Sequence, residues 1–226
     1  MSTIGFRIFP SPPRPADRLL AAFRSLPTSN ISDNMLRHYG AGARLRPYHR
    51  GAKLVGSAFT VKTRPGDNLL THKAIDMAAP GDVILVDAGG ALDHAIIGEI
   101  MSSHAKQRGI AGIIIDGAIR DADAIAASDF PIYACGVTHR GPYKDGPGEI
   151  NVTVCIAGMV VNPGDIIVGD ADGVVAIPRA DAERVIAMTT AQKEKEEAIL
   201  ATIESGKSID RAWVDEMLRD KGCALP

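Results

Sequence analysis

Short apolar runs, rich in valine and isoleucine, fill the chain from residue 51 onward and most narrowly limit its possible folds. Runs of roughly four to eight such residues, bounded by glycine, proline or aspartate, are typical of buried β-strands. The runs lie in KLVGSAFTVKT, PGDVILVDAGG, GIIID, IYACGVT, INVTVCIAGMVV, PGDIIVG and GVVAIP. Between them, Ile96 to Arg108 carries apolar residues at helical spacing and ends at Gly109. Strands interspersed with a helix predict an α/β domain.

The tripeptide Pro-Gly-Asp occurs at residues 65, 80 and 163. Proline followed by glycine is the pattern of a type II turn, because glycine tolerates a positive φ at the third position. The second and third copies therefore predict turns that lead into strands. The first copy is followed by asparagine, and PGDNLLTHKA is more typical of a loop that enters a helix.

Helical segments flank this region. Residues 1–15 contain PSPPRP and predict an extended arm, because proline fixes φ and removes an N–H donor. Ala16 to Leu26 has helical spacing and stops at Pro27. A long helix follows Pro178, with Asp181 as the expected N-cap, and its polar middle QKEKEEA faces solvent or a subunit contact. We therefore expect one α/β domain over residues 16–206 and a helical tail over 207–226.

Composition narrows the classes of function. No apolar run approaches the ~18 residues of a membrane span. The net charge of -2, without a long basic run, gives no reason to expect a nucleic-acid partner. Three widely spaced cysteines favour a reducing compartment over a disulfide framework. We expect a cytoplasmic protein that acts on small molecules.

The segment IIIDGAIRDADAI places Arg120, Asp121 and Asp123 directly after a buried strand. A helix from Gly98 to Arg108 and a returning strand from Ile110 to Asp116 would bring Arg120 and Asp121 level with the first N–H groups of that helix. Those N–H groups favour an anion, and arginine binds a carboxylate with two parallel hydrogen bonds. Asp121 could then hold Mg²⁺ or Mn²⁺. The simpler alternative is a surface ion pair.

The segments GDVILVDAGG, GEI, AKQRGIAGIIIDGAIRDADAI and FPIYACGVTHRGP, followed by INVTVCIAGMVVNPGDIIVGDADGVVAIP, resemble the RraA-like proteins. These include 4-hydroxy-4-methyl-2-oxoglutarate aldolases and the regulator of ribonuclease activity A. The likeness covers residues 28–205 and implies a swivelling β/β/α domain with N- and C-terminal helical extensions. It also implies a homotrimer or homohexamer with active sites between subunits.

In the aldolase branch, the resemblance implies that pyruvate contacts helix-start amides and an arginine. The matching residues here are Gly98, Glu99, Ile100, Met101 and Arg120. The resemblance also implies a metal held directly by Asp121, and contacts through water from Glu99 and from a glutamate of a neighbouring subunit. Position favours Glu196 for that glutamate and leaves Glu194 and Glu197 open.

One departure concerns the acidic residue that the aldolases usually carry three places after the metal aspartate. This chain has Ala124 there and Asp123 one residue earlier. The retained Arg120-Asp121 pair favours an enzyme over a regulator, because the regulators often lose the aspartate. The resulting hypothesis is a metal-dependent aldolase that cleaves 4-hydroxy-2-oxo dicarboxylic acids to pyruvate and also decarboxylates oxaloacetate. The alternative is a non-enzymatic protein-binding regulator of ribonuclease activity.

The roles of several other polar residues have more than one interpretation. No pair of histidines has the spacing of a zinc site. His72 either lines the site or has a structural role. His104 falls on the helical stripe and reads as a partly buried side chain. Residues 139–149, HRGPYKDGPGE, form either a mobile lid or a plain surface loop, in which Arg140 could meet a second carboxylate. Lys73, Lys106 and Lys144 lack a Schiff-base context.

Overall fold

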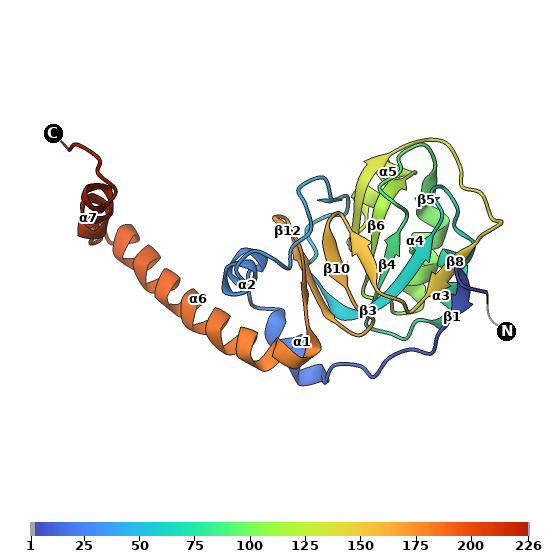
Figure 1. Cartoon of the computed structure of the whole chain (residues 1–226), viewed down its shortest axis with the longest axis horizontal. Helices are drawn as coiled ribbons and strands as arrows, with labels where there is room; N and C mark the ends of the chain where they lie inside the picture. Colours follow the sequence, from blue (N-terminus) through green and yellow to red (C-terminus); the bar gives the residue numbers. More distant parts are fainter. Residues whose placement is uncertain (1–2, 226) are drawn as a thin grey trace.

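The computed structural model describes residues 3–225 and has an α/β architecture with a mixed central sheet (Figure 1). The path through this sheet is β1-β8-β3-β4-β6-β7-β2, and β5, β11 and β12 join it off the path. The bounds along the path are β1 Phe6–Ile8, β8 Gly148–Ile150, β3 Leu54–Thr63, β4 Asp82–Asp87, β6 Gly112–Ile119, β7 Ile132–Val137 and β2 Arg46–Pro47. The remaining strands are β5 Ala95–Ile97, β11 Ile166–Asp170, β12 Gly173–Ile177, and the hairpin of β9 Val154–Ile156 with β10 Met159–Val161.

The centre of the sheet is buried on both faces. Strands β3, β4, β6 and β7 run parallel, and parallel strands covered on both sides read as unbroken apolar runs. Helices α3 (Leu69–Met77) and α4 (Glu99–Gln107) share one apolar core with this sheet. The hairpin β9–β10 contributes to a second core. Helices α1 (Asp17–Phe23) and α2 (Thr28–Asn34) pack with β11 and β12 in a third.

The Pro-Gly-Asp turns are confirmed. Gly66, Gly81 and Gly164 have φ of 76°, 82° and 86°, as the third position of a type II turn requires. The second copy leads into β4 and the third into β11, whereas the first leads into helix α3. The same tripeptide thus precedes two kinds of element, as the residues that follow each copy predict.

The N-terminal arm is extended and attached to the body. β1 pairs in parallel with β8, and the Arg14 guanidinium lies 3.2 Å from the Asp82 carboxylate. Further along, Arg179 Nη1 donates to the Pro13 carbonyl at 2.7 Å. The arm therefore runs in extended form along the outside of the body, from β1 to α1 (Figure 1).

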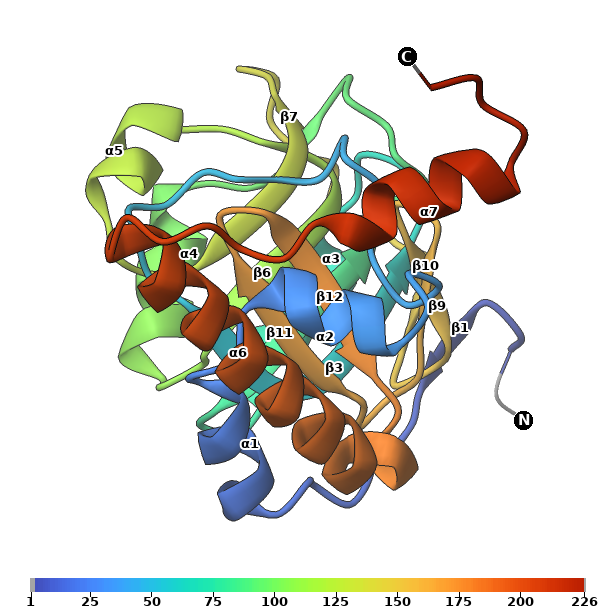
Figure 2. The same ribbon diagram turned by 90° about the vertical axis from the view of Figure 1, so that its left-hand side faces the viewer.

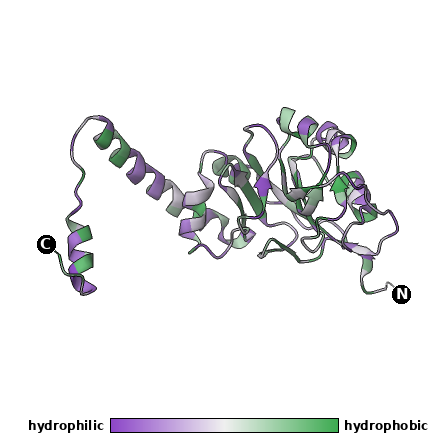
Figure 3. Ribbon diagram, turned by 90° about the horizontal axis from the view of Figure 1, so that it is seen from above, coloured by the Kyte–Doolittle hydropathy of each residue, from purple (hydrophilic) through white to green (hydrophobic). Residues whose placement is uncertain are grey.

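The C-terminal helices extend away from the part of the molecule that contains the sheet. After a 3-10 turn at Arg179–Asp181, helix α6 (Ala182–Glu204) starts beside α1 and α2 and then extends outward to α7 (Ala212–Asp220) (Figures 1 and 2). Asp181 occupies the N-cap position, but its side chain makes no capping hydrogen bond. The middle of α6 is polar (Figure 3). Within residues 3–225, no helix is long and apolar enough to cross a membrane.

Two expected boundaries were wrong. Ile96 and Ile97 are not helical: they belong to β5, which pairs with the far end of β6, and α4 begins only at Glu99. The β6 strand does not stop at Asp116 but continues to Ile119. These shifts are linked, because the extra β6 residues supply the partners for β5. His104, which falls on the expected stripe, is exposed rather than partly buried.

Candidate active site

The end of β6 meets the start of α4. The Arg120 N–H donates to the Ile97 carbonyl at 3.0 Å, which fixes the chain as it leaves the strand. Asp121 then adopts a left-handed conformation with φ of 56° and begins helix α5 (Ala122–Ala127). The backbone N–H of Glu99 donates to Asp121 Oδ2 at 2.9 Å. Arg120 Nε lies 3.7 Å from the same oxygen. A guanidinium and a carboxylate therefore adjoin the first N–H groups of α4.

Gly98 makes this approach possible. A Cβ at this position would lie 2.3 Å from Asp121 Oδ2 and 2.9 Å from Arg120 Cγ, and both distances are too short for non-bonded atoms. The backbone of Gly98 is extended, with φ of -147°, so a side chain is excluded by space and not by backbone strain. Gly141 also lies close to the guanidinium, since a Cβ there would make a tight contact of 3.2 Å with Arg120 Nη1.

A cavity of 290 Å³ opens between these elements, a size at the small end of ligand sites, which span roughly 300–1,000 Å³. Its polar side chains are Asn68, His72, Arg120 and Lys144, and Ile96, Ile97 and Met101 supply apolar surface. No aspartate or glutamate is among its lining residues in the part of the chain that the structure describes. Such a lining suits a small anion that also carries apolar carbon atoms.

Comparisons with known proteins place the chain in a family. The family model RraA-like, described as Aldolase/RraA, matches residues 28–176. The chain belongs to the RraA-like family. A relative from Halalkalibacterium halodurans is 39% identical over 199 residues, which span 88% of this chain and 95% of that protein. Its provisional name is 4-hydroxy-4-methyl-2-oxoglutarate aldolase.

Solved structures show the same RraA-like fold. An uncharacterized protein from Pseudomonas syringae is 28% identical with a TM-score of 0.78, over 87% of this chain and 97% of that one. The RNA-processing inhibitor RraA from Thermus thermophilus is 28% identical with a TM-score of 0.62, over 67% of this chain and 92% of that one. The family thus includes proteins named as aldolases and proteins named as inhibitors.

The residues matched to the family pattern fall into two groups in the structure. Gly98, Ile100, Met101 and Arg120 line the cavity. Glu99 instead lines a separate hollow of 200 Å³ between α4 and α5, together with Ala124. The Asp121 side chain is 41% exposed beside Arg120, and Asp123 is exposed on α5. The arginine and the helix-start groups therefore meet at one cavity, whereas Glu99 lines the neighbouring hollow.

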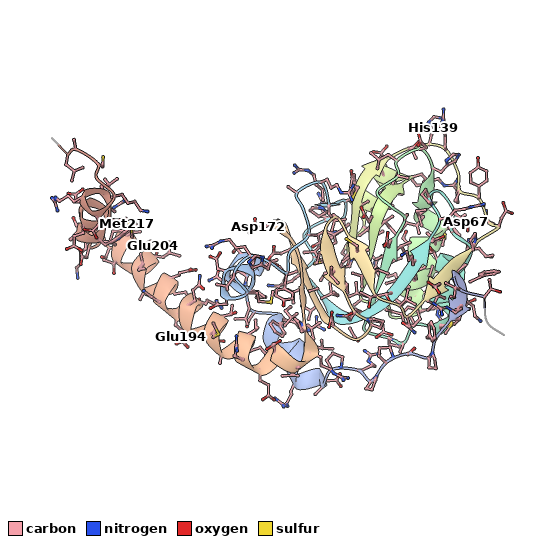
Figure 4. The ribbon with its side chains drawn as sticks, viewed as in Figure 1. Asp67, His139, Asp172, Glu194, Glu204 and Met217 are labelled. Atoms are coloured by element: carbon pink, nitrogen blue, oxygen red, sulfur yellow. The ribbon has the colours of Figure 1, made fainter. Side chains whose placement is uncertain are left out.

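Glu196 lies elsewhere in the chain. Its carboxylate accepts hydrogen bonds from Asn30 Nδ2 at 2.6 Å and from Gln192 Nε2 at 2.8 Å, and these donors lower its pKa. Glu197 pairs with Lys193 at 3.5 Å, and Glu194 also lies on α6, which leads away from α4 and α5 (Figure 4). Within one chain, the α6 glutamates and the Arg120-Asp121 pair therefore occupy different sides of the molecule.

The loop over residues 139–149 is held in place by a residue whose role the sequence did not reveal. Asp67 is fully buried, and its Oδ2 accepts the N–H groups of Asp145 at 2.7 Å and Gly146 at 2.9 Å. The Tyr143 N–H donates to the Gly66 carbonyl at 2.8 Å, and the Asn68 N–H donates to the Tyr143 carbonyl at 3.0 Å. Asp67 and the loop residue His139 both lie at the end of the body away from α6 (Figure 4). The loop is therefore tied to the start of α3.

Three polar side chains join the site beyond those that the family pattern supplied: Asn68, His72 and Lys144. His72, for which a site role was one of two alternatives, lines the cavity from α3. Partial desolvation lowers the pKa of His72, and the nearby Lys144 cation lowers it further. Lys144, which sequence reasoning weighed only as a Schiff-base lysine, also lines the cavity, whereas Arg140 does not. The four-residue spacing of Asn68 and His72 was the signal that they share one face of a helix.

The donor set bears on the metal that the family resemblance implies. Among the described residues, no group of three histidine, cysteine or acidic side chains could hold a metal ion. Mg²⁺ is commonly bound by one or two carboxylates, with waters and substrate oxygens as its other ligands. The exposed Asp121 carboxylate beside the cavity fits such an open site for a hard cation. It does not fit a zinc site closed by four side chains of one chain.

Proposed function

We propose that this RraA-like protein is a divalent-metal-dependent aldolase that cleaves 4-hydroxy-2-oxo dicarboxylic acids of the 4-hydroxy-4-methyl-2-oxoglutarate type to pyruvate. The observation that carries the proposal is the Arg120-Asp121 pair seated against the start of α4, beside a cavity that no acidic residue of the described range 3–225 lines. The provisional aldolase name of the relative at 39% identity supports the same reaction class.

Binding and orientation come from the chain itself. The Arg120 guanidinium receives the substrate carboxylate in two parallel hydrogen bonds. The N–H groups of Ile100 and Met101, which have no carbonyl partner within the helix, stabilise its negative charge. Ile96, Ile97 and Met101 exclude water from the carbon chain.

Cleavage starts when the 4-hydroxyl group loses its proton. The C3–C4 bond then breaks, its electron pair stays on C3, and C4 becomes the carbonyl carbon of the second product. Protonation of C3 completes pyruvate. Mg²⁺ or Mn²⁺ held at Asp121 would supply Lewis-acid stabilisation of the negative charge that develops. Glu99, on the exposed first turn of α4, is our candidate for positioning the water that takes the proton. Loss of CO₂ from oxaloacetate gives the same three-carbon product and is expected as a side activity.

We further propose a cytoplasmic homotrimer or homohexamer in which Glu196 of a neighbouring copy completes the site. The outer part of α6 supports this assembly, because Ile199, Leu200 and Ile203 are exposed there. We expect no nucleic-acid or membrane partner.

The test is a coupled assay of pyruvate release from 4-hydroxy-4-methyl-2-oxoglutarate and from oxaloacetate, with Mg²⁺ or with a chelator. We expect metal-dependent turnover that is lost in Asp121→Ala. The melting temperature of the variant should fall only by roughly 2–8 °C, because the hydrogen bond from the Glu99 N–H is also lost. Full turnover by Asp121→Ala in chelator would refute the mechanism.

A second candidate function is non-enzymatic regulation of ribonuclease activity, which the similarity to the Thermus RNA-processing inhibitor favours. Stoichiometric binding to a ribonuclease, without metal-dependent turnover of either acid, would select this function instead.

A further inference from the structure

The hydrogen-bond donor side chains around the cavity come from separate elements. Arg120 follows β6 and lies beside the start of α4, whereas His72 is on α3 and Lys144 is on the loop between β7 and β8. Arg120 has Asp121 as a neighbouring carboxylate at 3.7 Å. Lys144 has no carboxylate within 4.0 Å among the residues that the structure describes. The cavity therefore has one cation beyond those that a single carboxylate requires.

The position of Lys144 is fixed by its loop. On its C-terminal side, the N–H groups of Asp145 and Gly146 are held by the buried Asp67 carboxylate. On its N-terminal side, the backbone of Tyr143 is bonded to Gly66 and Asn68. The lysine backbone is thus anchored on both sides to the residues that begin α3, and α3 also carries His72. This anchoring keeps the backbone of Lys144 beside the cavity that its side chain lines.

We propose that Lys144, assisted by His72 as a hydrogen-bond donor, binds the second carboxylate of the substrate and thereby selects dicarboxylic over monocarboxylic 2-oxo acids. This inference rests on the proposed function, since it takes Arg120 and the start of α4 as the site of the first carboxylate. A five-carbon diacid then meets a separate cation for each of its two charges, and a monoacid leaves Lys144 without a partner.

The probes are 2-oxoglutarate and 2-oxopentanoate. Both have a 2-oxo acid end and five carbons, but a methyl group replaces the distal carboxylate in the second. Neither has a 4-hydroxyl group, so neither undergoes the proposed cleavage. Isothermal titration calorimetry with Mg²⁺ present measures the affinity of the wild-type protein for each compound, and the ratio of the two dissociation constants measures the contribution of the distal carboxylate.

We expect the wild-type protein to bind 2-oxoglutarate about tenfold to a hundredfold more tightly than 2-oxopentanoate, as expected for a hydrogen bond between charged groups. Lys144→Met, which keeps most of the length of the side chain but removes the charge, should abolish the preference and leave 2-oxopentanoate affinity unchanged. Lys144→Arg should retain it. Arg140→Met is the matched control, because Arg140 lies on the same loop but does not line the cavity.

The possible outcomes separate this inference from the proposed function. Equal affinity of the wild-type protein for the two acids refutes the second carboxylate site but leaves the 2-oxo acid site standing. A preference that persists in Lys144→Met, or an equal loss of both affinities in that variant, also overturns the assignment of Lys144. Binding of neither acid by the wild-type protein refutes the proposed function itself. Because Lys144 is exposed, its replacement should leave thermal unfolding unchanged.

Discussion

Gly98→Ala tests whether the guanidinium and carboxylate must lie against the start of α4. The added methyl group would sit 2.3 Å from Asp121 Oδ2 and 2.9 Å from Arg120 Cγ. Relief requires Asp121 to turn toward water, which its 41% exposure permits. That movement breaks the 2.9 Å hydrogen bond from the Glu99 N–H. The backbone itself accepts alanine, because φ of -147° lies in the extended region.

We expect Gly98→Ala to reduce turnover far more than stability. Losing one partly exposed, charge-assisted hydrogen bond at a helix start costs about 1–2 kcal/mol. In a chain of this length that lowers the melting temperature by roughly 2–8 °C. Turnover should fall more steeply, by about 10²-fold, because a misplacement of ~1 Å in a catalytic group can have that effect.

Thermal unfolding and the coupled pyruvate assay measure the two quantities on the same samples. Gly40→Ala is the matched control, since a Cβ there meets its nearest atoms only at 3.8 Å and should change neither. If Gly98→Ala unfolds and turns over like the wild type, then the tight approach of Arg120 and Asp121 to Gly98 is unnecessary. The reasoning that ties this geometry to activity would then be wrong.

Two further variants probe other contacts. Arg120→Lys should reduce turnover by about 10²-fold in the coupled assay, because a single ammonium group cannot form two parallel hydrogen bonds with a carboxylate. The melting temperature should not fall. Near-normal turnover would exclude that contact. Burial alone would raise the pKa of Asp67, but N–H donors from Leu69, Asp145 and Gly146 and the Arg64 guanidinium outweigh it and lower the pKa below 3.8. The charged form therefore stabilises the fold above about pH 4, and this stabilisation disappears as pH falls through the lowered pKa. Asp67→Asn should accordingly cost about 2–3 kcal/mol of unfolding free energy at pH 7. In denaturant titrations this cost should shrink as pH falls below about 4, and a cost independent of pH would contradict the assignment.

Local patterns predicted the strands and turns because each depends on residues that are close in sequence. The strand β6 was predicted too short because its end depends on residues that are distant in sequence. As a charged residue, Asp116 predicts the end of the strand. It is instead buried within the strand and accepts a 2.7 Å hydrogen bond from the Arg44 guanidinium. It also accepts the Ala157 N–H at 3.0 Å. These partners lie far away in sequence, so no local pattern reveals that the carboxylate is compensated. Likewise, β5 is a strand only because the extension of β6 pairs with it.

The three Pro-Gly-Asp copies show where sequence reasoning about the site reached its limit. In the second and third copies, the aspartate closes its own turn: Asp82 accepts the Ala79 N–H and Asp165 accepts the Asn162 N–H, both at 2.8 Å. In the first copy, Asp67 instead accepts two N–H groups from residues 145 and 146. The same tripeptide therefore serves a local turn twice and a long-range tether once. The Asn-Leu-Leu that follows the first copy predicted a different element, but only the fold reveals that its aspartate holds the loop of Lys144. The loop over residues 139–149 has three glycines and two prolines, yet its backbone is for this reason tethered beside α3, and Gly141, Pro142 and Lys144 line the cavity from it.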